Sequence, residues 1–198
     1  MATVQRLAPF ATTIFAEMSA LAVAHDAVNL GQGFPDTDGP ASMLAAAQSA
    51  IADGHNQYPP GIGIPALRQA VARHQLAHYG LDYDPDTEVL VTVGATEALA
   101  GAVVGLVEPG REVIMIEPYY DVYAATVAMA GGVRRTVGLI GDGDGFVLDR
   151  DRLAAAFGPE TAMIIVNSPH NPTGTVLHDD DLAEIARLCV EHLSLIHI

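Results

Sequence analysis

Residues 161–174, TAMIIVNSPHNPTG, indicate the fold, because an apolar run gives way abruptly to a polar stretch with two prolines. The run from Ala162 to Val166 predicts a strand buried on both faces of a parallel sheet. Pro169 and Pro172 exclude a central strand or a helix, so the chain must turn sharply at the strand's carboxyl end. Ligands of open α/β sheets bind at that end. A plain proline-rich loop is the alternative interpretation of this stretch taken alone.

The composition predicts a globular α/β chain. Its 198 residues suffice for one sizeable core, and 50% of them are hydrophobic. Strand-like and helix-like runs alternate, which predicts right-handed parallel crossovers and a doubly wound sheet. The formal charge of −15 argues against nucleic acid and anionic membranes as partners. The single cysteine, Cys189, allows no disulfide framework and fits a reducing cytosol, so we expect a cytoplasmic protein with a buried or partly buried thiol.

The N-terminal residues predict a helix rather than an export signal. Ile14, Met18 and Leu21 follow helical spacing, and Glu17 interrupts the apolar stretch. We therefore expect residues 1–30 to form an N-terminal helical arm and residues 31–198 to form a large domain.

A glycine turn in the middle of the chain predicts an anion site. Residues 88–93 predict a strand, and a helix is expected from Glu97, with Thr96 near its N-cap. The first backbone N–H groups of such a helix, with the threonine hydroxyl, can bind a phosphate. The glycine fingerprint of dinucleotide-binding folds is missing, which argues against an NAD enzyme. A simple threonine-capped turn is the alternative.

An aromatic pair ends the next predicted strand. Tyr119 and Tyr120 follow residues 112–116, and a ring at this end of a strand can stack on a planar ligand. Filling the gap between strand and helix is the alternative, which suits Tyr119 better. His74 and His78 lie one helical turn apart without a third ligand in view, so we expect no metal site.

Four strings together resemble the class I and II pyridoxal-phosphate (PLP) aminotransferases of fold type I. They are LGQGFPD at 30–36, NQYPPG at 56–61, VTVGATEAL at 91–99 and NSPHNPTG at 167–174. The resemblance implies part of a large PLP-binding domain, with a mostly parallel sheet, in a protein that forms homodimers. We expect the C-terminal small domain of that fold to lie outside these 198 residues. Within the family, the strings are most similar to N-succinyldiaminopimelate and kynurenine-type aminotransferases, the former serving lysine biosynthesis.

The resemblance assigns cofactor contacts to five residues. Ala95 and Thr96 match the phosphate-binding turn, and Tyr120 matches the aromatic residue that lies against the pyridine ring. Asn171 matches the asparagine whose amide binds the phenolic oxygen of PLP. Tyr58 matches the tyrosine that reaches the phosphate in the neighbouring subunit. Two further positions match substrate contacts: Gly33 through its backbone N–H, and Phe15 as an aromatic residue at the substrate entrance.

The resemblance also implies parts that are missing. All nine basic residues are arginines, so no lysine can bind the cofactor covalently or shuttle a proton. The carboxylate that keeps the pyridine nitrogen protonated and the arginine that binds the substrate carboxylate are expected beyond residue 198. Residues 193–198 predict the start of another strand but do not lead toward the expected aspartate motif, so they need not be the native continuation. We expect an N-terminal half that has no catalytic residue of its own and is inactive alone.

The expected reaction of the whole protein is transfer of an amino group between an amino acid and a 2-oxo acid. A PLP-dependent β-lyase that cleaves carbon–sulfur bonds is the alternative with the same fold and cofactor. A non-catalytic binding half-domain is the alternative of a different class, and the absence of lysine is compatible with it.

Overall fold

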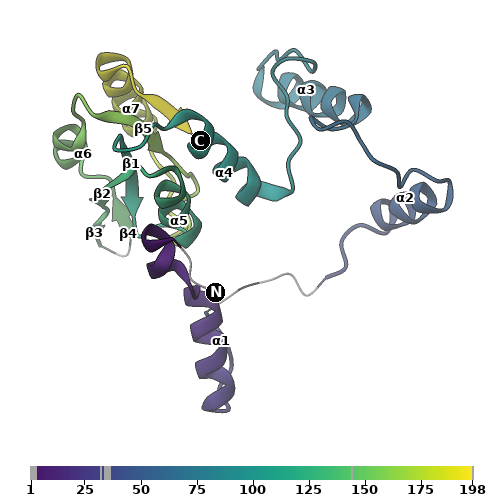
Figure 1. Cartoon of the computed structure of the whole chain (residues 1–198), viewed down its shortest axis with the longest axis horizontal. Coiled ribbons are helices and arrows are strands. Elements are labelled where there is room, and N and C mark those ends of the chain that lie inside the picture. The colour runs from purple at the N-terminus through teal and green to yellow at the C-terminus, as the bar shows by residue number, and fades with distance from the viewer. Residues whose placement is uncertain (1–3, 32, 34–36, 144, 198) are drawn as a thin grey trace.

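The computed structural model describes residues 4–31, 33, 37–143 and 145–197 (Figure 1). Its main sheet has four parallel strands in the order β2-β1-β5-β6. The strands are β1 (Glu112–Glu117), β2 (Val133–Gly138), β5 (Thr161–Ile165) and β6 (Leu195–His197). The parallel, doubly wound sheet predicted from the sequence is therefore confirmed, as is a strand within residues 193–198, of which Ile198 lies outside the described residues.

Seven α-helices, one 3-10 helix and a short hairpin make up the remaining regular structure of the described residues. The helices are η1 (Gln5–Phe10), α1 (Ile14–Ala24), α2 (Ala41–Ala52), α3 (Pro65–Tyr79), α4 (Gly94–Leu106), α5 (Asp121–Ala130), α6 (Arg150–Ala156) and α7 (Asp179–His192). The hairpin joins β3 (Ile140–Asp142) to β4 (Gly145–Val147). None of the described helices is both long and apolar enough to cross a bilayer.

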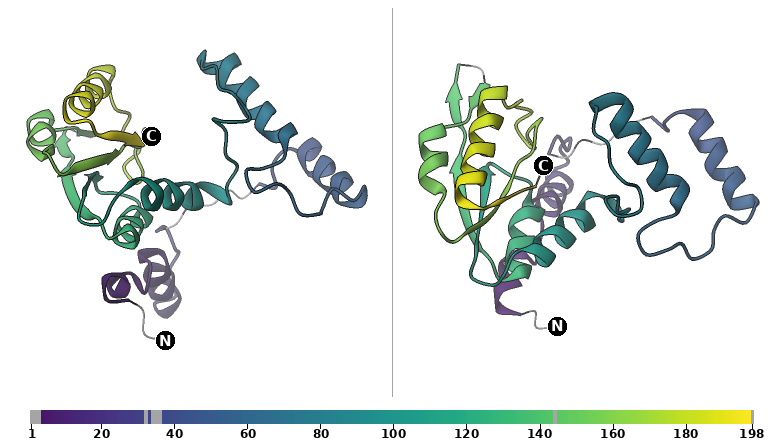
Figure 2. Two further views of the ribbon diagram at one scale, coloured as in Figure 1. Left: turned by 45° about the horizontal axis from the view of Figure 1, so that its top comes forward. Right: turned by 90° about the horizontal axis from the view of Figure 1, so that it is seen from above.

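Helices cover both faces of the sheet (Figure 2). Successive residues of a strand face opposite sides, so Ile114 of β1 packs with α6 and α7, and Met115 packs with α4 and α5. Strands β1 and β5 lie in the middle of the sheet and are buried on both sides. This double burial explains why their sequences are continuous apolar runs.

Residues 88–93 are not a strand, contrary to the prediction. Val91 donates one backbone hydrogen bond, to the Ile62 carbonyl at 3.1 Å, and no strand of the described residues lies beside this segment. The apolar pattern gives a segment its tendency to extend, but a strand also needs a neighbour to complete its ladder.

Helices α1, α2 and α3 project away from the sheet (Figure 1). Neither α1 nor α2 contains a buried residue, and Arg68 is the buried residue of α3. The helix predicted around Ile14, Met18 and Leu21 is present, but these three side chains are 54%, 41% and 51% exposed. Apolar helix faces of this kind are uncovered in the part of the chain that the structure describes.

The single thiol is buried, as predicted. Cys189 of α7 is 3% exposed and packs in the core on the α6–α7 side of the sheet. Burial raises the pKa of the Cys189 thiol to about 11, because it disfavours the thiolate.

The raised pKa predicts that Cys189 is unreactive in the folded protein. At pH ~8.5 about half of unfolded thiols are ionised, whereas folded Cys189 stays protonated. Alkylation by iodoacetamide at this pH should be slow in buffer and fast in urea. For the same reason, the contribution of this thiol to stability is lost as the pH rises from ~8.5 towards 11. Equal alkylation rates in buffer and in urea would contradict the buried position.

Candidate functional site

The candidate site lies at the carboxyl edge of the sheet. Strands β1 and β5 are adjacent and parallel, so the segments that follow them leave the sheet at the same edge. The segment after β1 carries Tyr119 and Tyr120, and the segment after β5 carries Asn171. The peptide bonds before Pro118, Pro169 and Pro172 in these segments are cis.

A buried histidine holds the Asn171 segment against β1. His170 is 3% exposed; its Nε2 atom lies 3.3 Å from the Ile116 carbonyl oxygen and its Nδ1 atom lies 2.9 Å from the Thr173 hydroxyl. A carbonyl only accepts hydrogen bonds, so Nε2 carries the proton. The Asn171 backbone N–H donates to the Asn167 side-chain oxygen at 2.7 Å. The string NSPHNPTG drew attention to its asparagine, but not to the positioning role of the histidine before it.

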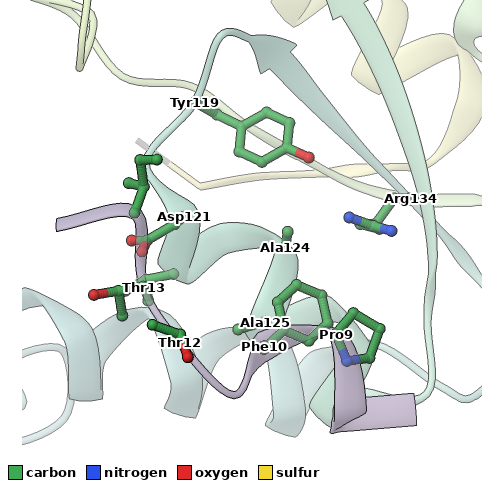
Figure 3. Close-up of a pocket in the computed structure, with 11 residues that line it drawn as sticks. Pro9, Phe10, Thr12, Thr13, Tyr119, Asp121, Ala124, Ala125 and Arg134 are labelled. Carbon is green, nitrogen blue, oxygen red and sulfur yellow. The ribbon is translucent and has the colours of Figure 1, made fainter. Parts of the chain in front are cut away.

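Tyr120 lies between aromatic neighbours. It is the N-cap residue of α5, and its ring centroid is 6.4 Å from that of Phe15 and 5.8 Å from that of Tyr123, which meets it edge-on. Both Tyr119 and Tyr120 are half-buried against the core cluster on this face. The two tyrosines have similar burial but different neighbours. Tyr120 lies beside Phe15 of the arm, and Tyr119 lines a cavity beside η1 (Figure 3).

The predicted phosphate turn is the first turn of α4, which begins earlier than expected. Thr96 is the third residue of the helix rather than its cap, because the helix starts at Gly94 and Val93 is the N-cap residue. The Glu97 carboxylate accepts the Val93 backbone N–H. This bond satisfies one amide at the helix start, and helix geometry leaves the N–H groups of Ala95 and Thr96 without an intrahelical partner.

The direction of α4 places this turn towards the carboxyl edge. Five residues separate the end of α4 at Leu106 from the start of β1 at Glu112, so the C-terminus of α4 lies near the amino edge. A helix of 13 residues is ~20 Å long, so its N-terminus lies towards the opposite edge. Helix α4 packs on α5 and β1 through Leu99 and Val103.

Two predicted residues lie apart from this group. Tyr58 is 100% exposed in the loop between α2 and α3. Gly33 is exposed, and a Cβ built on it would meet no described atom within 4 Å. Residues 32 and 34–36 of the LGQGFPD string lie outside the described residues.

The candidate site is an open surface in this chain. Thr96, Tyr120 and Asn171 line none of the five clearest cavities of the described residues. Within the same described ranges, no group of three or more His, Cys, Asp or Glu side chains is arranged to hold a metal ion. The available groups are helix N-terminal amides, an aromatic ring and an exposed amide, which suit an anionic, planar ligand.

Comparison with known proteins gives the family. Residues 25–198 match the model of the family described as aminotransferase class I and II. The chain belongs to this family. Its members are PLP-dependent enzymes, so PLP is the cofactor to which this aminotransferase sequence is adapted.

The chain spans about half the length of the curated relatives that it matches. It is 64% identical over 188 residues to a protein of Mycobacterium tuberculosis named as a probable N-succinyldiaminopimelate aminotransferase, covering 95% of this chain and 47% of that protein. It is 42% identical to the methionine aminotransferase of Escherichia coli, covering 94% of this chain and 48% of the enzyme. The solved structure of the N-succinyldiaminopimelate aminotransferase of M. tuberculosis superposes with a TM-score of 0.94 at 62% identity, covering 98% of this chain and 51% of that one.

The contacts of His170 predict that its loss loosens the Asn171 segment. In His170→Phe, the buried Ile116 carbonyl loses its His170 donor, which costs ~1–3 kcal/mol of unfolding free energy, whereas the Thr173 hydroxyl keeps its contact with Thr175. Denaturant unfolding of the intact protein measures this cost, and hydrogen exchange at Gly174, whose N–H donates to the His170 carbonyl, reports the local loosening.

The matched control is His74→Phe, which alters an exposed histidine of α3. Its effect should stay within ~0.5 kcal/mol. An equal effect of the two substitutions would show that the His170 contacts do not hold the segment.

Proposed function

We propose that this chain supplies half of the PLP pocket of an aminotransferase that moves an amino group between an amino acid and a 2-oxo acid. The observation that supports the proposal is that the segments carrying Tyr120 and Asn171 follow two adjacent parallel strands and so leave the sheet at one edge, in a chain of a PLP-dependent family. When bound, PLP supplies an electron-withdrawing ring that stabilises negative charge at the carbon that loses its proton.

The phosphate role belongs to Ala95 and Thr96. Their first-turn amides and the Thr96 hydroxyl are donors, and the helix dipole adds partial positive charge at this end. The carboxylate of Glu97 is the one charge of the turn that opposes an anion, and its hydrogen bond to the Val93 amide directs it to the backbone. The donor set therefore fits a phosphate.

The ring and oxygen roles belong to Tyr120 and Asn171. The Tyr120 ring is partly exposed beside Phe15, so one side can stack on a planar ligand. No hydrogen bond joins the exposed Asn171 side-chain amide to another described residue, so its N–H₂ group can donate to the phenolic oxygen of PLP. His170 would then act by holding the segment that carries Asn171 against β1.

Substrate contacts are assigned to the N-terminal arm and the residues after it. Phe15 lies 6.4 Å from Tyr120, centroid to centroid, and would cover the entrance beside the cofactor ring. Gly33 would offer its backbone N–H to the substrate. The arm would comprise residues 1–30, and the PLP-binding domain residues 31–198.

A homodimer would explain the exposed residues of α2 and its loop. Tyr58 is fully exposed and would reach the phosphate bound by a second copy. Apolar side chains of α1 and α2 are exposed and would be covered by that copy. A single, buried cysteine supports a reducing, cytoplasmic location.

The 64% identity supports N-succinyldiaminopimelate as the amino donor or product class. Transfer of its amino group to a 2-oxo acid by the intact protein is the direct assay. Release of a thiol and ammonia from a cysteine conjugate, with no amino group on the acceptor, would replace this proposal by a β-lyase. Binding of PLP without either reaction would favour a non-catalytic module.

The stacking role predicts a split between two substitutions of Tyr120. Tyr120→Phe keeps the ring and should bind PLP about as tightly as the unmodified intact protein. Tyr120→Ala loses a contact of ~0.5–1.5 kcal/mol, which is a loss of about twofold to tenfold in affinity. Titration followed by cofactor absorbance measures both values, and equal affinity of the two variants would refute the stacking role.

The lysine count predicts the behaviour of residues 1–198 alone. The family reaction needs a lysine amine at the cofactor, and this chain has none. Purified residues 1–198 with added PLP should therefore transfer no amino group in the assay that detects the intact protein. Measurable turnover would show that another group replaces the lysine.

A further inference from the structure

Arg68 of α3 is a buried charge that none of the proposed cofactor contacts explains. Its side chain is only 7% exposed, and an arginine is rarely buried without partners, because removing its charge from water is costly. Three oxygens around the guanidinium offset this cost. The Nε atom donates to the Gly63 carbonyl at 3.2 Å, and the Nη1 atom donates to the Pro85 carbonyl and, at 2.8 Å, to the Asp86 carboxylate.

These partners come from both sides of α3 in the sequence. Gly63 lies just before the helix, after the loop that carries Tyr58, whereas Pro85 and Asp86 lie after the helix, on the way to α4. Two of the three acceptors are backbone carbonyls, so the bonds fix the course of the main chain. A guanidinium carries its donors in a rigid plane and can hold two segments at a set separation, which the single nitrogen of a lysine cannot do.

The segment before α3 contacts the chain that leads into the proposed phosphate turn. The Ile62 carbonyl accepts the Val91 backbone N–H at 3.1 Å. Gly63 lies so close to Val91 that a Cβ at residue 63 would be 2.5 Å from a Val91 methyl carbon, and its φ of +95° also favours glycine. Val91 is four residues before Ala95, the first residue assigned to the phosphate. A displacement of Gly63 would therefore move the start of α4.

The segment after α3 leads to the same residue along the chain. Residues 84–87 form a turn in which the Asp84 carboxylate accepts the Asp86 backbone N–H at 2.9 Å and the Thr87 hydroxyl at 2.8 Å. These bonds stiffen the turn that the guanidinium holds, and three residues separate this turn from Val91. Both segments held by the guanidinium therefore constrain the position of Val91.

We propose that Arg68 is a positioning residue for the cofactor phosphate. It does not touch the phosphate. It holds the segments before and after α3 at a fixed separation, so that the first-turn amides of Ala95 and Thr96 keep one direction. This inference rests on the proposed function, which assigns the phosphate to that turn.

A comparison of PLP with pyridoxal, which lacks the phosphate, tests the proposal in the intact protein after removal of its cofactor. The ratio of the two dissociation constants reports the phosphate contacts, because effects common to both ligands cancel. Arg68→Lys keeps the charge but has one nitrogen in place of three, so it cannot hold Gly63 and Pro85 together. Its preference for PLP over pyridoxal should fall by at least ~10-fold, the equivalent of one hydrogen bond to a charged group. An unchanged ratio would overturn the positioning role, even if the melting temperature fell.

Two further variants separate this inference from the phosphate assignment. Arg73→Lys is the matched control, because it makes the same change at an exposed arginine of α3, and it should keep the ratio of the unmodified protein. Thr96→Val removes a proposed phosphate donor and should lower the ratio. If Thr96→Val leaves the ratio unchanged, the phosphate assignment itself is wrong and this inference falls with it. If it lowers the ratio and Arg68→Lys does not, only the role of Arg68 is wrong.

Hydrogen exchange at the Val91 amide adds a readout without any cofactor. Exchange should be faster in Arg68→Lys than in Arg73→Lys, because the segment that accepts this N–H is released. Equal rates would show that Arg68 does not hold the chain before α4. If Arg68→Lys does not fold, Gly63→Ala tests the same link, since its Cβ must displace Val91. The preference of Gly63→Ala for PLP should also fall, and an unchanged preference would overturn the proposal.

Discussion

The parallel pairing of β1 with β5 places the groups of the candidate site at one edge of the sheet. Paired residues such as Met115 and Ile165 are 50 residues apart in sequence, and the segments that follow them leave the sheet at the same end. Both strands are central, so helices on both faces exclude water from their hydrogen bonds. His170 extends this constraint beyond the strands, because it joins the segment after β5 to the end of β1 through the Ile116 carbonyl. Rigid strands thus position residues that lie on loops.

The helices of this chain differ strongly in how much of their surface is buried. The sheet packs against α4 and α5 on one face and against α6 and α7 on the other, with a core cluster on each side, whereas α1 and α2 bury no side chain in the described part of the chain. Exposed apolar faces of this extent are typical of surfaces that another body covers. Because of this contrast, the proposed function includes a second copy of the chain as well as a cofactor. Tyr58, fully exposed between α2 and α3, is assigned to the phosphate bound by that copy.

The sequence predicts the sheet and its helices well because their signals are local. Continuous apolar runs mark β1 and β5, and Gly80 and Gly131 end α3 and α5 in the left-handed conformation. Residues 88–93 carried the same apolar signal without forming a strand, since pairing depends on a neighbour that a local pattern does not specify. Helix α4 starts at Gly94 rather than at Glu97 as predicted, and the Glu97 side chain accepts the Val93 amide N–H at this earlier start. The contacts of His170 and Arg68 could not be predicted, because they join segments that are separate in the sequence.

A crystal structure of the intact protein with PLP tests the central claim most directly. The account predicts the phosphate within hydrogen-bond distance of the Ala95 and Thr96 amides, the pyridine ring against Tyr120, and the Asn171 amide at the phenolic oxygen. A cofactor bound elsewhere, with these residues facing solvent or only protein, would contradict it.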